Sequence, residues 1–274
     1  MPERALLCLF GVINRSIKCT WKNINSNIVE HLKKNNIETD VYVFNLVCDN
    51  GLVDGVNVNN NDHTIIESTF YECKSQSVLD HDIKEKIETV PYKPSYVLWY
   101  TDNQIHNTMR QMYSEYRVGA FIRTHMKDYD YAIVCGPDYY VTKPINIHDL
   151  RKSKKNNMVY ISDVNPGMNG YTNGYYVSSN LKDMSIMLCR YEHILPFLKD
   201  FKGDYEQLLK KYCDANSVQV MSTDQVFFKI RANKTIFWQG FNDKHKEDDH
   251  NKTAYQSVMK EFDLRAQEVF EKRC

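Results

Sequence analysis

The chain has 274 residues, of which 42% are hydrophobic, so it is long enough to bury a sizeable core. Its 35 lysines and arginines balance its 35 aspartates and glutamates, which leaves no overall basic charge to attract nucleic acid or an anionic membrane. The eight cysteines have no metal-binding spacing and no apolar run approaches the roughly 18 residues that span a bilayer, so we predict a soluble cytoplasmic protein with reduced thiols.

The first 47 residues predict a strand, a helix and a second strand. Residues 5–13 are continuously apolar, as in a strand buried on both faces. Ser16 is a suitable helix N-cap. Apolar residues then recur at helical spacing, namely Ile17, Trp21, Ile24, Ile28 and Leu32. With the strand predicted at 40–47, this is the βαβ unit of a parallel sheet.

The middle of the chain continues the alternation of strands and helices. Residues 49–62 are a polar loop rich in glycine and asparagine. Segments 64–74 and 95–101 have the composition of strands, and Asp102 can cap a long helix that ends near Asp128. A short apolar strand at 131–135 follows.

The second half predicts further strands at 158–164, 175–179 and 234–238. Helices are expected near 183–200 and 204–213, and another follows the polar run at 242–252. This alternation predicts an α/β fold.

Candidate ligand-binding residues follow two of these strands. In an open α/β sheet, ligands bind beyond the carboxyl ends of the strands. Residues 11–15 precede a helix, where N–H groups and Arg15 favour an anion, although an ordinary βα turn fits the same pattern. Asp138 follows Gly136 and Pro137 just past a buried strand, where it can hold a divalent cation or form a Pro-Asp turn. The glycine patterns of dinucleotide and P-loop sites are absent.

The order of the chain's segments resembles that of the GT-A nucleotide-sugar glycosyltransferases. The amino-acid sequences of these segments resemble those of the glycosyltransferases of large algal (chlorella-type) DNA viruses. The segments concerned are LCLFGVINRSIKCTWKNINSNI, DVYVFN, MRQMYSEYRVGAFI, YDYAIVCGPDYYVTKPIN and NGYTNGYYVSS. They cover most of residues 5–180. The resemblance implies one GT-A domain, with a Rossmann-like mixed sheet flanked by helices. Its two abutting lobes would bind the nucleotide (about 1–145) and the acceptor (about 146–274).

The resemblance also implies which residues bind the donor. The expected nucleotide-binding residues are Gly11, Val12, Asn14, Arg15, Tyr113, Arg117, Asp138, Gly240 and Lys244. The alternatives are core packing for Tyr113 and a solvated helix face for Arg117. Asp138 matches the last acid of the family's metal-binding DxD motif, with Mn²⁺ or Mg²⁺ as cofactor, but Gly136 stands where the first acid would be. Phe237 replaces a metal-binding histidine of the late GxxK segment. His245 or His250 could substitute, and a solvated charged loop is the alternative for both.

On the acceptor side, the resemblance implies a loop that faces the sugar and the acceptor. The residues expected there are Asp163, Asn169 and Gly170. Inverting GT-A enzymes use an acid near the start of a late helix as the catalytic base. Asp224 would occupy that position, with Ser222 or Thr223 as the cap; a plain capping acid is the alternative.

The resulting hypothesis is a glycosyltransferase that moves a sugar from a UDP-sugar to a hydroxyl of a glycan acceptor. The viral resemblance favours UDP-xylose as the donor and implies glycan synthesis on viral glycoproteins in an infected host cell. Asp224 would act as the base of an inverting mechanism, with a retaining one left open. Two alternatives remain: an inactive sugar- or nucleotide-binding module, and a sugar nucleotidyltransferase. The sequence makes no prediction of oligomeric state.

Overall fold

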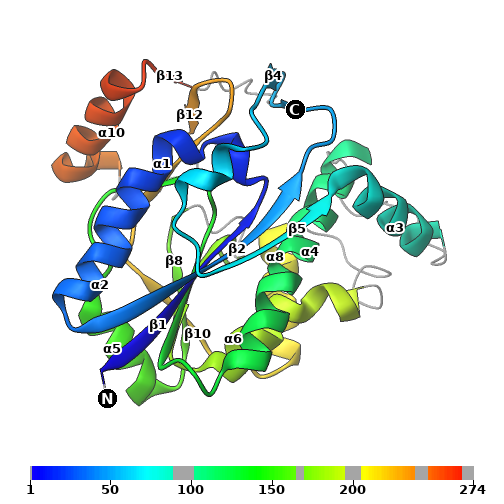
Figure 1. Ribbon diagram of the computed structural model, residues 1–274. Coiled ribbons are helices and arrows are strands. Elements are labelled where there is room, and N and C mark those ends of the chain that lie inside the picture. Colours follow the sequence, from blue (N-terminus) through cyan, green and yellow to red (C-terminus); the bar gives the residue numbers. More distant parts are fainter. Residues whose placement is uncertain (1, 89–101, 165–169, 195–204, 238–245, 267–274) are drawn as a thin grey trace.

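A seven-stranded sheet runs through the middle of the molecule (Figure 1). The computed structural model describes residues 2–88, 102–164, 170–194, 205–237 and 246–266. Within these, the strand order is β10-β8-β9-β6-β1-β2-β5. Neighbouring strands are parallel except where β9 pairs with β6 and β8. The structure thus confirms the predicted α/β architecture, a mixed sheet flanked by helices.

The strands of this sheet are β1 (Glu3–Gly11), β2 (Ile37–Val47), β5 (Phe70–Ser75), β6 (Tyr131–Cys135), β8 (Val159–Ser162), β9 (Tyr175–Ser178) and β10 (Val220–Thr223). Side chains alternate between the two faces of a strand. On β1, Leu6 and Cys8 enter one hydrophobic cluster, whereas Leu7 and Leu9 enter the other. Both faces are therefore buried, which explains the continuous apolar run in the sequence.

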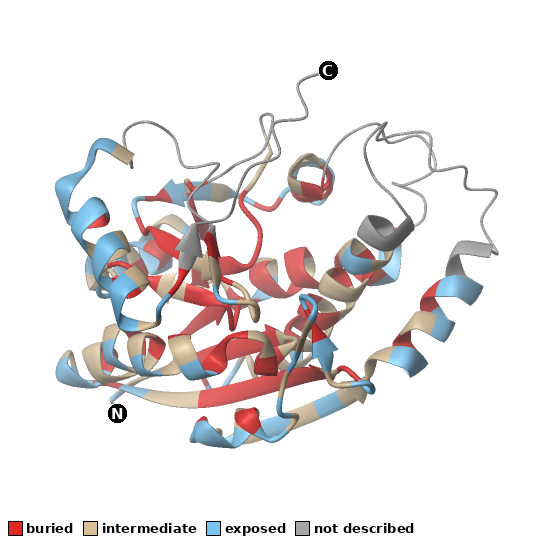
Figure 2. Cartoon of the chain, turned by 90° about the horizontal axis from the view of Figure 1, so that it is seen from above, coloured by how far each residue is buried: buried red, intermediate tan, exposed pale blue. Residues whose placement is uncertain are grey.

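Helices cover both faces of the sheet. One face packs against α1 (Ile17–Ile24), a π-helical turn (Asn25–Val29), α2 (Glu30–Lys34) and α5 (Ile147–Asn156). The other packs against α3 (Gln76–Glu88), α4 (Asp102–His125), α6 (Leu181–Leu188) and α8 (Tyr205–Ala215). Figure 2 shows buried residues on the inner sides of these helices and exposed ones on their outer sides. No helix among the described residues combines the length and apolarity needed to cross a membrane.

A smaller sheet packs beside the first, with strand order β13-β12-β11-β7. Its strands are β7 (Tyr139–Val141), β11 (Phe227–Ile230), β12 (Thr235–Phe237) and β13 (Arg265–Ala266). Phe228 and Ile236 of this sheet form a third hydrophobic cluster with Val258 of α10 (Asp249–Glu261). Because strands before and after residue 145 complete the same large sheet, the division into two lobes at that point stays a prediction.

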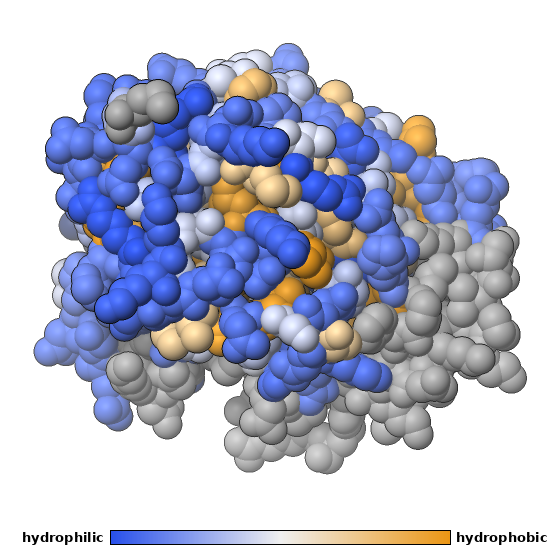
Figure 3. Space-filling model, turned by 90° about the horizontal axis from the view of Figure 1, so that it is seen from below, coloured by the Kyte–Doolittle hydropathy of each residue, from blue (hydrophilic) through white to orange (hydrophobic). Residues whose placement is uncertain are grey.

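Seen from below, hydrophilic side chains cover most of the described surface, and hydrophobic ones are visible mainly in the middle (Figure 3). That distribution fits a sheet whose apolar faces are covered by helices.

Most predicted elements are present, but several differ from the prediction. The loop at 49–62 contains a short hairpin of β3 (Leu52–Val53) and β4 (Val56–Asn57), and a 3-10 turn (Asp62–Ile65) takes up the start of the strand predicted at 64–74. Ser16 precedes α1 as expected but makes no capping hydrogen bond, because its hydroxyl donates to the carbonyl oxygen of Ile230. The strand predicted at 95–101 lies outside the described residues.

The first helix is joined to the turn after β6 by a buried hydroxyl. Thr20 Oγ1 donates to the carbonyl oxygen of Pro137 at 2.6 Å. Thr39 Oγ1 offers a contrast, because it is buried and has no hydrogen-bond partner among the described residues.

Replacing these two threonines by valine should have opposite effects on stability. Thr20→Val keeps the shape but leaves the Pro137 carbonyl without a donor, so we expect the free energy of unfolding to fall by about 1–3 kcal/mol. Thr39→Val removes an unpaired hydroxyl from a strand and should be neutral or stabilising. Urea denaturation measures both, and equal losses in the two variants would contradict the assignment.

Candidate functional site

A cavity of about 840 Å³ lies at the carboxyl ends of β1 and β6. The β3–β4 hairpin, α4, the start of α8 and the end of β11 complete its walls. This is where the open-sheet rule places a ligand. The charged residues among its described lining are Arg15, Asp54, Arg110, Asp138, Glu206, Lys229 and Arg231.

The end of β1 and the turn after it supply Gly11, Val12 and Arg15 to this cavity, three of the residues predicted to bind the nucleotide. Gly11 has a φ of +99°, a conformation that favours glycine. The N–H groups of Ile13 and Arg15 donate to the Asn45 side chain and the Val12 carbonyl oxygen, at 3.3 and 3.1 Å. These two N–H groups are therefore not open to an anion, and the charged group that the turn offers is the Arg15 guanidinium.

Asn14, predicted to contact the nucleotide, is buried and has a different set of contacts. Its Nδ2 donates to the Asn60 carbonyl oxygen at 3.1 Å, and its Oδ1 accepts from the His63 N–H at 3.0 Å. It fixes the loop before the Asp62–Ile65 turn and is not among the described lining residues of the cavity.

Asp138 lies in the cavity between two arginines. Its Oδ2 is 3.1 Å from Arg231 Nη1 and 3.8 Å from Arg15 Nη1. The Asp138 side chain is only 10% exposed, whereas those of Arg231 and Arg15 are 31% and 30% exposed. Arg15 Nε also pairs with Asp54 of the hairpin at 3.3 Å. The carboxylate thus lies beneath two cations that face the cavity.

Lys229 adds a third basic side chain. Its Nζ lies 5.2 Å from the centre of the Tyr139 ring. Burial lowers the pKa of Lys229, Arg231 and Arg15 act in the same direction, and Asp138 and Glu206 oppose them. Sequence reasoning missed Lys229 and Arg231. The signal was available, because two basic residues two positions apart on an apolar strand share one face.

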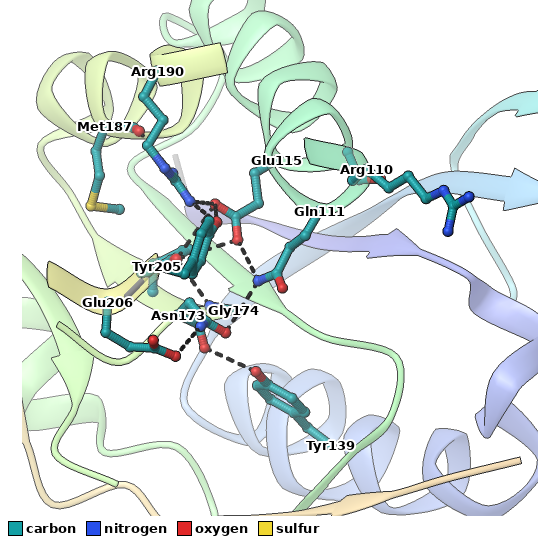
Figure 4. Close-up of polar contacts among 12 residues, drawn as sticks. Arg110, Gln111, Glu115, Tyr139, Asn173, Gly174, Met187, Arg190, Tyr205 and Glu206 are labelled. Carbon is teal, nitrogen blue, oxygen red and sulfur yellow. Dashed lines mark hydrogen bonds and ion pairs between the residues drawn. The ribbon is translucent and has the colours of Figure 1, made fainter. Parts of the chain in front are cut away.

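On another wall, Glu206 lies in the first turn of α8. Its Oε1 accepts a hydrogen bond from Asn173 Nδ2 at 2.6 Å. Figure 4 shows this carboxylate beside Asn173, whose Oδ1 accepts from Gln111 at 3.1 Å and whose carbonyl oxygen accepts from the Tyr139 hydroxyl at 2.9 Å. Glu206 was not among the residues predicted from the sequence, although it is an acid near the start of a late helix.

Behind this wall lies a fully buried ion pair between Glu115 and Arg190. Arg190 also contacts the Tyr205 hydroxyl and donates to the Met187 carbonyl oxygen at 3.0 Å. Gln111 Nε2 donates to Glu115 at 3.0 Å, which connects the pair to the cavity (Figure 4). Burial works against the charge of Arg190, but Glu115 keeps its pKa well above the ordinary value.

Helix α4 contributes to the cavity, but not through the face that the sequence analysis chose. Arg110, Gln111 and Ser114 line the cavity, whereas Tyr113 and Arg117 are not among its described lining residues. Tyr113 packs edge-on against Phe44 and Tyr191, and Arg117 pairs with Glu72 at 2.5 Å. Neither contact supports the predicted nucleotide-binding role.

The prediction of a helix that begins near Asp224 is wrong. Asp224 lies between strands β10 and β11, because the buried residues after it pair with β7 instead of forming a helical face. Its exposed carboxylate accepts from Lys143 Nζ at 2.5 Å, and it is not among the described lining residues. Its catalytic role stays a prediction, without support from this position.

The residues predicted to bind the acceptor do not all lie where the sequence placed them. Asp163 follows β8 and is outside the described lining of the cavity. At Gly170 a β-carbon would come within 2.3 Å of the Glu206 backbone, so this glycine allows the loop to pack on α8. His250 lies in α10 and contacts the Thr142 carbonyl oxygen at 2.9 Å. Asn169, Gly240, Lys244 and His245 lie outside the described residues.

A DxD-type metal centre does not fit the described residues. A β-carbon at Gly136 would lie 2.9 Å from the Tyr139 ring and 3.1 Å from Asp138 Oδ1, so there is no space for a second acid. Asp138 is already paired with two arginines. Among the described parts of the chain, no three histidine, cysteine or acidic side chains are grouped as a metal site.

Comparison with known proteins leaves function to be argued from the site itself. No protein-family model and no curated protein matches the chain. Among solved structures, it is similar to the crystal structure of mouse xyloside xylosyltransferase 1 in its apo form, with a TM-score of 0.43 and 11% sequence identity. That similarity covers 97% of this chain and 95% of the mouse chain.

Breaking the buried pair should strongly destabilise the protein. Arg190→Met leaves the Glu115 carboxylate buried without its cation, so we expect the free energy of unfolding to fall by about 3–5 kcal/mol. Adding Glu115→Gln removes that charge and keeps hydrogen-bonding atoms, so the double variant should lose less than Arg190→Met alone.

The matched control is Arg151→Met, which removes an exposed arginine paired with Glu3 at 2.7 Å and should cost at most about 1 kcal/mol. Urea denaturation measures all three variants. An Arg190→Met variant as stable as the control would contradict a structural role for the buried pair.

Proposed function

We propose that the protein is a glycosyltransferase that moves a sugar from a nucleotide-sugar to a hydroxyl of a glycan acceptor. The observation that carries this proposal is the cavity at the strand ends. There Arg15, Lys229 and Arg231 lie in the same space as the Glu206 carboxylate. Cations of this kind stabilise a departing diphosphate, and a carboxylate can accept a proton from an attacking hydroxyl.

In the proposed reaction, Glu206 takes the proton of the acceptor hydroxyl. The hydroxyl oxygen forms a bond to the anomeric carbon of the donor sugar, and the bond from that carbon to the diphosphate oxygen breaks. The nucleoside diphosphate leaves with the electron pair, and the cations neutralise its charge. Attack from the side opposite the leaving group makes this an inverting mechanism.

Glu206 replaces Asp224 as the proposed base for two reasons. It is in the first turn of a helix and lines the cavity, whereas Asp224 is in a connection between strands and pairs with Lys143 outside it. The hydrogen bond from Asn173 also orients the Glu206 carboxylate. UDP as the nucleotide, xylose as the sugar and a viral glycan as the product rest on the sequence resemblance alone.

A panel of nucleotide-sugars tests the reaction. We expect the purified protein to release UDP from a UDP-sugar, with UDP-xylose as the first candidate, and UDP to raise the melting temperature more than ADP or GDP. At a ligand concentration about 100 times its dissociation constant, binding stabilises the fold by roughly 2.7 kcal/mol, which a melting curve resolves.

The same panel separates the alternatives. Binding without release of a nucleoside diphosphate from any donor would favour an inactive module. Release of pyrophosphate from a nucleoside triphosphate and a sugar phosphate would favour a nucleotidyltransferase.

Two amide variants distinguish the candidate bases. Glu206→Gln keeps the size of the side chain and the oxygen that accepts from Asn173, so UDP binding should change little. Losing a general base should lower kcat by a factor of about 10² to 10⁴. The control Asp214→Asn changes an acid elsewhere on α8 that pairs with Lys210, and turnover should stay near that of the wild type. If turnover falls in Asp224→Asn and not in Glu206→Gln, the base predicted from the sequence is right.

A further inference from the structure

The Asp138 carboxylate lies at the position where the DxD motif would supply a metal ligand. Its neighbours, however, are the guanidinium groups of two arginines. Two guanidinium groups lie within 4 Å of its Oδ2. A divalent cation bound to the same carboxylate would be repelled by both at short range in a partly buried site. Hard cations also need several oxygen ligands, and Gly136 cannot be replaced by an acid without displacing its neighbours.

The neighbours of Gly136 are fixed in place. The Tyr139 ring stacks on Phe227 with their centres 4.0 Å apart and their planes 8° apart. Its hydroxyl donates to the Asn173 carbonyl oxygen and lies against Gly174, where a β-carbon would come within 2.4 Å of it. Because the ring cannot move aside easily, the position of the missing acid is closed by packing.

The cavity provides positive charge by other means. Arg15 and Arg231 share Asp138, and both line the cavity with partly exposed side chains. Lys229 lies beside them, and among the described residues it makes no ion pair with a carboxylate. A diphosphate carries several negative charges on oxygens that guanidinium groups bind in pairs. Three cations from two segments far apart in the chain therefore match this ligand chemically.

We propose that the cavity binds the diphosphate of its ligand through Arg15, Lys229 and Arg231 without a divalent cation, and that Asp138 is an ion-pair partner of the two arginines instead of a metal ligand. The inference rests on the proposed function, because it takes the ligand to be a nucleoside diphosphate. It assigns opposite roles to Asp138 and to a DxD acid: a metal ligand strengthens diphosphate binding, whereas an acid that shares arginines with the phosphate competes with it.

Calorimetry with inorganic pyrophosphate, UDP and uridine tests the inference, each with EDTA or with Mn²⁺. We expect pyrophosphate and UDP to bind in EDTA with affinities within about threefold of those in Mn²⁺, a difference under 1 kcal/mol. Arg231→Met should weaken both by about 10- to 100-fold, the value of a charge-assisted hydrogen bond, and leave uridine binding unchanged. Arg231→Lys keeps the charge and should lose less.

The direction in which Asp138→Asn changes pyrophosphate affinity decides between the two roles of Asp138. Removing the competing negative charge should leave pyrophosphate binding in EDTA as tight as in the wild type or tighter. The control Arg151→Met changes a surface arginine that pairs with Glu3 and should bind like the wild type. Circular dichroism checks that each variant is folded. Binding that requires Mn²⁺, or its loss in a folded Asp138→Asn variant, would overturn the inference.

The inference and the proposed function can fail separately. If pyrophosphate binds in EDTA through Arg231 but no nucleotide-sugar is turned over, the inference stands and the proposed function falls. If a UDP-sugar is turned over only with Mn²⁺, the proposed function stands and the inference falls. Failure of pyrophosphate and UDP to bind under either condition would overturn the inference.

Discussion

The buried ion pair between Glu115 and Arg190 is the interaction on which one whole wall of the cavity depends. Removing two charges from water costs several kcal/mol per ion, so such a pair survives only with good geometry and further hydrogen bonds. Gln111 and the Tyr205 hydroxyl supply these bonds. The pair joins α4, the turn that follows α6, and the start of α8. It therefore determines where Glu206, one residue after Tyr205, lies.

The opposite wall is organised by aromatic packing and by charge. Tyr139 stacks on Phe227, and this contact holds the turn after β6 against β11. As a result Asp138 lies beneath Arg231, and Arg15 approaches from the turn after β1. The two walls meet at Asn173, which accepts from Tyr139 through its carbonyl oxygen and donates to Glu206 through its side chain. A proton acceptor and a set of cations thus come to share one cavity.

The sequence predicted the main strands and helices well because each depends on the pattern of apolar residues within its own segment. The buried strands β1, β2 and β6 each appear as an apolar run, and the helix after β1 shows its apolar spacing. The site was predicted in part for the same reason, since Arg15 and Asp138 directly follow strands whose carboxyl ends meet at one edge of the sheet. Prediction was wrong where tertiary pairing overrode local pattern: the segment after Asp224 forms β11 because β7 offers it a partner.

By itself the sequence determined the α/β class and the order of its main strands and helices, because burial on one or two faces of an element gives a regular pattern of apolar residues. It also identified two of the charged residues in the cavity. Only the tertiary structure decided what those charges do. Arg15 and Arg231 are more than 200 positions apart, and their meeting at Asp138 depends on the packing of β11 against β7. The pairing of Glu115 with Arg190 likewise leaves no periodic signal, since Glu115 on α4 and Arg190 in the turn after α6 each look like surface residues until these two elements pack together.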